Sequence, residues 1–238
     1  MNIILFEPDE VDAPLARGDL RARHILKVLR AKVGDSIDVG IVDGSMGTAV
    51  LEAIGAKTLS LRFEWGAVGP PLHPVDLIVG LSRPRTCQKI LNEATTLGVR
   101  SLRFVRTELG ERSYAQSKLW TSGDWRRHVV AGASQACSTR IPLVKFDLPL
   151  RQALSEVPAD ATTVALHNHG VTDSLASVPM NTGAVVLAIG SERGWTPDEV
   201  EVLREHGFGL VGLGRRVLRT ETAVISALSI TLSRAYWD

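Results

Sequence analysis

Along the carboxyl-terminal two thirds of the chain, short uninterrupted apolar runs alternate with longer segments in which apolar residues recur at helical spacing. The apolar runs predict buried strands at residues 75–81, 102–105, 164–166, 184–189 and 208–213. Helical spacing predicts helices at residues 84–97 and 124–136, and another that begins after Thr196. Strands that alternate with helices are typical of an α/β domain, in which helices cover both faces of a mostly parallel sheet.

Local signals support these helices. Thr196 is expected to be an N-cap, with Pro197 at the first helical position and Glu199 placed to complete a capping box. Gly98 follows residues 84–97 at the position where glycine commonly ends a helix. Residues 215–223 lead into a last helix.

The first 70 residues have a different pattern. Short strand-like segments at residues 37–42, 48–51 and 59–63, with turns between them, predict a small β-barrel. One helix is expected at residues 20–30, since Ala22, Ile25, Leu26 and Leu29 form an apolar stripe there. The proline- and glycine-rich residues 66–74 indicate a boundary, so we expect two domains, residues 1–70 and 71–238.

Composition narrows the class of protein. The chain has 238 residues, 45% of them hydrophobic, and a formal net charge of +1. That balance excludes a globally basic protein, so any contact with nucleic acid must be a local patch. Cys87 and Cys137 lack the spacing of a metal or redox site, and no signal peptide or membrane span is evident. We therefore expect a cytoplasmic protein that does not enter a membrane.

One local patch is strongly basic. Around the expected helix 20–30, six cationic side chains face a single acidic one, Asp19; they are Arg17, Arg21, Arg23, Lys27, Arg30 and Lys32. Such a cluster is usually a solvated face. On a small barrel, however, a one-sided cationic helix also suits an RNA phosphate backbone. Both interpretations remain open from the residues alone.

Polar residues cluster where three of the predicted strands end, at residues 167–170, 190–194 and 214–222. Ligands of parallel α/β sheets bind beyond the carboxyl ends of strands, so these loops predict a site. The G-x-G-x-x-G pattern at residues 207–212 precedes a strand instead of following one, which argues against a dinucleotide site. His167 and His169 have no third ligand at a recognisable spacing, so we predict no metal; the pair lines a pocket rim or faces solvent.

Two separated motifs resemble those of the bacterial 16S rRNA uridine-N3 methyltransferases of the SPOUT class. The first is His24 followed by Val28-Leu29-Arg30 and Val33-Gly34-Asp35. The second matches the family's closing signature, with Val217 in place of isoleucine, at Leu213, Gly214, Arg216, Leu218, Arg219, Glu221, Thr222 and Ala223. Two matches in the correct order are stronger than either one.

The chain also departs from that family. The family's Gly-Pro-Glu-Gly-Gly loop is Gly190-Ser191-Glu192-Arg193-Gly194 here, and its Lys and Glu before Leu-Gly-Val are Glu93 and Thr96. An arginine of the family is absent from residues 134–138, although Arg140 and Pro142 are kept. The fold and cofactor therefore carry over more safely than the target nucleotide. The alternatives are a paralogue that methylates another RNA position and a non-catalytic RNA-binding protein involved in ribosome assembly.

The resemblance implies an N-terminal PUA-like barrel and a C-terminal methyltransferase domain with a trefoil knot, which forms a homodimer. It further implies S-adenosylmethionine as the cofactor and 16S rRNA, or the small ribosomal subunit, as the partner. In such a protein the cationic residues Arg21, Arg23, His24, Lys27 and Arg30 bind RNA. The cofactor is expected at Leu166, Ile189, Gly190, Gly194, Leu213, Gly214, Val217 and Leu218, where apolar side chains suit an adenine.

The chemistry makes further demands. Uridine N3 carries a proton, so methylation requires that this proton be removed or the resulting anion stabilised. Arg219 and Arg216 are candidates to stabilise the anion, while Glu192 and Glu221 are candidates for the base or for holding an arginine. Alternatively, Arg219 and Glu221 only pair with each other at the start of the last helix. Because N3 lies on the Watson–Crick edge, the base must be unpaired or extruded.

Overall fold

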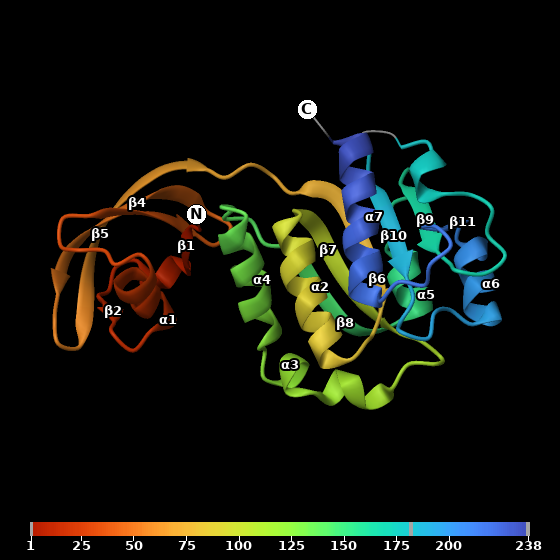
Figure 1. Ribbon diagram of the computed structural model, residues 1–238, viewed down its shortest axis with the longest axis horizontal. Helices are drawn as coiled ribbons and strands as arrows, with labels where there is room; N and C mark the ends of the chain where they lie inside the picture. The colour runs from red at the N-terminus through yellow and green to blue at the C-terminus, as the bar shows by residue number, and fades with distance from the viewer. Residues whose placement is uncertain (1, 181–182, 237–238) are drawn as a thin grey trace. The chain divides into compact units, whose positions relative to one another are not determined.

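The computed structural model describes residues 2–180 and 183–236. The chain forms two compact units, one made of Met1–Pro71 with Ala133–Ile141, the other of Leu72–Gly132 with Pro142–Asp238. In Figure 1 the ribbon is coloured by residue number, so that the segments of each unit can be followed. Among the described residues, no helix has the length and apolar character needed to cross a membrane.

The first unit is a curled five-stranded sheet with strand order β1-β3-β4-β5-β2. Only β1 and β3 run parallel, and the other pairs are antiparallel. The strands are β1 (Ile4–Phe6), β2 (Leu15–Ala16), β3 (Ser36–Ile41), β4 (Ser45–Ile54) and β5 (Thr58–Val68). Its core contains the fully buried side chains of Ile25, Leu51 and Leu59. Strand β3 was predicted at the correct length but one residue too late, β4 and β5 were predicted at shorter lengths, and β1 and β2 were not predicted.

The expected helix at residues 20–30 is shorter and irregular. It consists of one α-helical turn, α1 (Leu20–Arg23), continued by a π-helical turn, η2 (His24–Val28). Asp19 caps α1 by accepting a hydrogen bond of 2.8 Å from the backbone N–H of Arg21. Arg30 has a φ of 54°, in the left-handed region, so the chain turns away before residue 30. A separate short 3-10 helix, η1 (Pro8–Glu10), precedes it.

Residues 133–141 complete the first unit, although they are distant from it in sequence. The carbonyl of Ser134 accepts a hydrogen bond of 3.1 Å from the N–H of Ile3, and that of Thr139 accepts one of 2.7 Å from the N–H of Asp43. Thr139 is fully buried, and a Cβ at Gly40 would lie 2.5 Å from its Cγ2. The glycine at position 40 therefore makes room for this segment.

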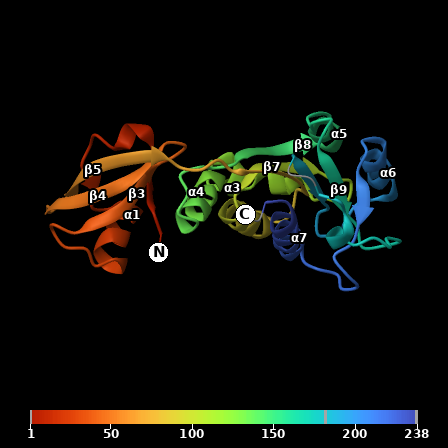
Figure 2. The same cartoon turned by 90° about the horizontal axis from the view of Figure 1, so that it is seen from above.

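The second unit contains a six-stranded parallel sheet with strand order β11-β9-β10-β6-β7-β8. The strands are β6 (His73–Gly80), β7 (Val99–Arg106), β8 (Leu143–Pro149), β9 (Thr162–Leu166), β10 (Val185–Ile189) and β11 (Gly209–Val211). Figure 2 shows α2 (Pro84–Thr96) and α7 (Thr220–Ala235) on one face and α5 (Leu150–Ser155) and α6 (Pro197–Glu205) on the other. The predicted α/β architecture, with helices on both faces of a parallel sheet, is confirmed.

Burial explains this layering. Ile78 and Ala188 belong to the cluster that packs against Leu154 of α5 and Leu203 of α6. The neighbouring residue Leu77 points to the other face of the sheet and is also fully buried. The remaining helical segments are η3 (Arg112–Gln116), α3 (Lys118–Thr121), α4 (Trp125–Gln135) and η4 (Leu175–Ser177).

Candidate functional site

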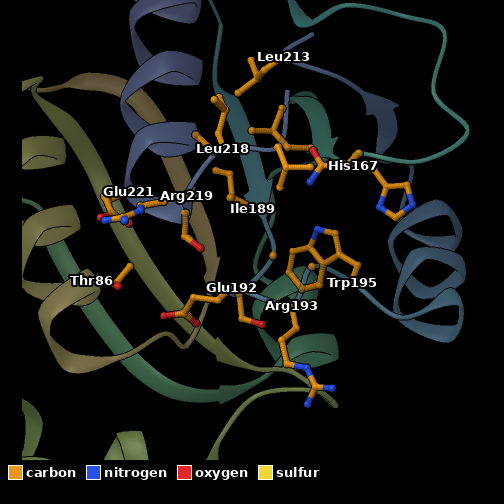
Figure 3. A pocket seen from close by; sticks show the side chains of 18 of the residues that line it. Thr86, His167, Ile189, Glu192, Arg193, Trp195, Leu213, Leu218, Arg219 and Glu221 are labelled. Carbon is orange, nitrogen blue, oxygen red and sulfur yellow. The ribbon is translucent and has the colours of Figure 1, made fainter. Parts of the chain in front are cut away.

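A cavity of about 700 Å³ lies beyond the carboxyl ends of β9, β10 and β11. Its walls come from the loops after these strands and from the first turns of α2 and α7, as Figure 3 shows for its labelled residues. These are the loops that the sequence predicts to form a site. The parallel sheet brings them together because its strands all end at the same edge.

Glycines allow the loop after β10 to fold tightly against the sheet. A Cβ at Gly80, the last residue of β6, would lie 2.3 Å from the backbone nitrogen of Ser191. A Cβ at Gly190 would lie 2.8 Å from the carbonyl carbon of Gly194, whose own φ is +72°. The N–H of Gly194 donates to the carbonyl of Ser191 at 2.9 Å and closes the turn. Larger residues at positions 80 and 190 would therefore displace this loop.

The predicted capping box of α6 is confirmed and has a second role. The hydroxyl of Thr196 accepts a hydrogen bond of 3.2 Å from the N–H of Glu199, and Oε2 of Glu199 accepts one of 2.9 Å from the N–H of Thr196. Oε1 of the same carboxylate accepts a hydrogen bond of 2.9 Å from the N–H of Glu108. This buried side chain therefore joins the start of α6 to the loop after β7.

Seven of the eight residues expected to hold the cofactor line the cavity: Leu166, Ile189, Gly190, Gly194, Leu213, Val217 and Leu218. The eighth, Gly214, is not among the lining residues. Its φ is +115°, and no atom lies within 4 Å of the position of a Cβ. Glycine at this position therefore serves the backbone turn after β11 and does not make room for a neighbouring group.

The four residues considered for catalysis, Arg216, Arg219, Glu192 and Glu221, also line the cavity. Oε1 of Glu192 accepts a hydrogen bond of 2.9 Å from the backbone N–H of Arg83, which holds this carboxylate at the start of α2. Arg219 is the N-cap residue of α7 and makes no side-chain capping hydrogen bond.

Glu221 forms its ion pair with Lys89 of α2, at 3.0 Å, and not with Arg219. Burial opposes the charged carboxylate, but the backbone N–H of Glu221, then Lys89 and the charge of Arg219 favour it, and together they hold the pKa of Glu221 below its ordinary value. Glu221 is therefore ionised at neutral pH and is a weak proton acceptor.

Several lining residues lie outside the predicted cofactor and catalytic set. Arg83 and Thr86 contribute from the start of α2, and Trp195 follows the glycine loop directly. A signal was present in each case, because these residues follow strand ends. His167 and His169 line the cavity with ring centroids 6.1 Å apart. Burial, followed by the nearby charge of His169, lowers the pKa of His167, so its ring is neutral at pH 7.

The expected RNA-binding residues lie in the first unit and differ in their environments. The guanidinium of Arg21 is half-buried, donates to Glu10 and Asp19 at 2.8 Å each, and lies 4.8 Å from the ring centroid of Phe6. Arg21 therefore stabilises the fold of this unit. The side chains exposed to solvent are those of Arg23, Lys27 and Arg30, while His24 is intermediate.

The second unit is thus a parallel α/β sheet with a cavity at its carboxyl edge, and the first is a curled sheet. Residues 69–232 match the family described as "RNA methyltransferase domain", and residues 19–64 match "RNA methyltransferase PUA domain". Because the first match covers more than half of the chain, the chain belongs to this family of RNA methyltransferases. The resemblance inferred from the two sequence motifs is confirmed.

Individual relatives narrow the comparison. "Ribosomal RNA small subunit methyltransferase E" of Treponema pallidum is 35% identical over 99% of this chain and 92% of its own length. Its counterpart "E 1" in Borreliella burgdorferi is 29% identical over 98% of each chain. A Neisseria gonorrhoeae enzyme of the same name, in a crystal structure described as bound to S-adenosyl methionine, is 25% identical over 97% of each chain, with a TM-score of 0.78.

Proposed function

We propose that this chain transfers a methyl group from S-adenosylmethionine to N3 of a uridine in the RNA of the small ribosomal subunit. The observation that carries the proposal is the cavity at the carboxyl edge of β9, β10 and β11. The similar N. gonorrhoeae protein is described as bound to this cofactor, and the T. pallidum and B. burgdorferi relatives are named small-subunit rRNA methyltransferases.

The lining residues fit the cofactor. The volume of about 700 Å³ suits a molecule of this size. Leu166, Ile189, Leu213 and Leu218 offer an apolar slot for the adenine. The exposed arginines Arg83 and Arg193 supply positive charge for the carboxylate of the methionine part.

The bound cofactor supplies an electrophilic methyl group attached to a sulfonium, and its leaving group departs neutral. The residues of the chain must position the base and handle the N3 proton. As N3 loses its proton, negative charge spreads onto the two flanking carbonyl oxygens, and we assign its stabilisation to the guanidinium groups of Arg219 and Arg216, which line the cavity. The lowered pKa of Glu221 makes it a weak proton acceptor, so we assign the N3 proton to the other lining carboxylate, Glu192.

The first unit then holds the flanking RNA through Arg23, His24, Lys27 and Arg30, while Arg21 maintains the fold beneath them. The homodimer and the trefoil knot that the resemblance implies remain predictions. Light scattering on the purified protein tests the dimer: a particle of twice the 25.7 kDa chain mass is expected, and a monomer at working concentrations contradicts it.

Nucleoside mass spectrometry tests the function. Small ribosomal subunits from a strain that lacks this gene are incubated with the purified protein and S-adenosylmethionine, then digested to nucleosides. The expected product is 3-methyluridine. Another methylated nucleoside contradicts the N3 assignment, while cofactor binding without any product supports the non-catalytic alternative.

A further inference from the structure

Trp195 carries a polar group that the proposed mechanism does not use. Its side chain is 5% exposed and packs in the core cluster with Ile78, Val186 and Val200. The indole Nε1–H has no hydrogen-bond partner among the described residues. A buried donor without an acceptor destabilises a folded protein, so the environment of this atom requires an explanation.

The position of Trp195 points to a ligand. Trp195 lines the cavity, and Figure 3 shows its indole nitrogen turned toward the side of the cavity where His167 lies. Of the described side chains that have a buried, unpartnered nitrogen or oxygen, Trp195 is the one that lines this cavity. This placement is the one expected of an N–H group whose hydrogen-bond acceptor belongs to a ligand in the cavity.

The type of donor selects the part of the ligand. Two cationic side chains of the cavity that the proposed mechanism does not use, Arg83 and Arg193, are exposed and suit a carboxylate. The indole N–H is uncharged and buried, which suits a neutral acceptor such as a purine ring nitrogen. The apolar walls formed by Leu166 and Ile189 suit the ring itself.

We propose that Nε1–H of Trp195 donates a hydrogen bond to a purine ring nitrogen of the adenosine part of the cofactor. This assignment rests on the proposed function. It makes Trp195 a residue that recognises adenosine and has no part in the methyl transfer.

Trp120 provides a matched control. It is 3% exposed, and its Nε1 also has no partner among the described residues. It stacks on Phe146 and packs at a tilt against Phe104, with ring centroids at 4.7 and 5.0 Å, and it does not line the cavity. A general effect of losing a buried indole should therefore appear equally at both positions.

The experiment measures the Kd of S-adenosylmethionine, S-adenosylhomocysteine, methylthioadenosine and adenosine by calorimetry. Trp195→Phe is compared with Trp120→Phe and the unaltered protein. In a second pair of variants, each tryptophan is replaced by 3-benzothienylalanine, which keeps the bicyclic shape and removes the N–H. Loss of one neutral hydrogen bond predicts affinities about three- to tenfold weaker for all four ligands at position 195, and unchanged at position 120. An adenosine analogue in which carbon replaces the contacted ring nitrogen should bind the unaltered protein more weakly than adenosine does. The benzothienyl variant at position 195 should bind the two equally well.

Unchanged affinity after either replacement of Trp195 would overturn the assignment. So would a loss confined to ligands that carry the methionine carboxylate, or an equal loss at position 120. If the adenosine pattern appears but no methyl group is transferred to RNA, the proposed function fails and the assignment stands. If the unaltered protein binds none of the four ligands, both fail.

Discussion

Replacing Arg219 by lysine separates catalysis from helix stability. The substitution keeps a positive charge but removes the planar guanidinium that can contact two points of the uridine anion at once. We expect the methyl transfer rate to fall about a hundredfold or more, the usual effect of removing one preorganised donor. That corresponds to roughly 2.7 kcal/mol of transition-state stabilisation.

The structure predicts that stability changes little. The side chain of Arg219 is exposed and makes no capping hydrogen bond, and the ion pair at the start of α7 joins Glu221 to Lys89 instead. Exposed substitutions of this kind usually alter the free energy of unfolding by no more than about 0.5 kcal/mol. Cofactor affinity should also be retained, because the interaction forms as charge develops on the base.

Single-turnover methylation of small-subunit RNA across pH, together with thermal unfolding, tests this expectation. Raising the pH should partly restore the rate, since the free uridine then ionises without assistance. Arg215→Lys is the matched control, because Arg215 is exposed on the same loop but does not line the cavity. A stable Arg219→Lys protein with full activity would refute the role of this residue. Equal losses at both positions would show that the loop, and not the guanidinium, is responsible.

Three other predictions follow from the geometry. Gly80→Ala should weaken cofactor binding in calorimetry, because its Cβ would lie 2.3 Å from the backbone nitrogen of Ser191; unchanged affinity would show that the loop has another position available. Glu221→Gln should lower the free energy of unfolding at neutral pH by about 1 kcal/mol or less, since Lys89 is mostly exposed. Because the folded pKa of Glu221 is lowered, this difference in stability should be present above pH 4.5 and vanish as the pH falls through the folded pKa. Denaturation at several pH values measures the difference, and a difference that persists in acid would contradict the expectation. Neutralising three exposed cations should flatten the salt dependence of RNA binding without changing cofactor affinity, and an unchanged slope would assign them to an ordinary solvated surface; they are Arg23, Lys27 and Arg30.

Periodicity predicted several buried elements of the second unit, although not α5, whose residues Leu150, Ala153 and Leu154 are buried. Continuous apolar runs predicted β6 and β10, and the capping residue Thr196 predicted the start of α6. Strand β8 was not predicted because it lies at the edge of the sheet, where Lys145 and Asp147 interrupt its apolar pattern. Edge strands bury less surface, so their sequences carry a weaker signal.

The sequence also predicted which loops meet, because parallel strands end at one edge of the sheet. It did not predict which hydrogen-bond donors in those loops lack an acceptor. The unpartnered N–H of Trp195 depends on how its ring packs against distant residues such as Ile78. Likewise, the charges near helix 20–30 were visible, while the burial of Arg21 between Glu10 and Asp19 was not. Side-chain pairing of this kind is decided by tertiary structure.

The discontinuous make-up of the first unit constrains how the protein is synthesised. The sheet up to Val68 emerges from the ribosome first, but its partners Ser134 and Thr139 emerge only after most of α4. Until then the N–H groups of Ile3 and Asp43 have no acceptor in residues 133–141, and the hollow at Gly40 is open to water. The unit therefore cannot complete its fold during translation until residue 141 has been added, and a fragment that ends at residue 71 would retain this unfinished edge.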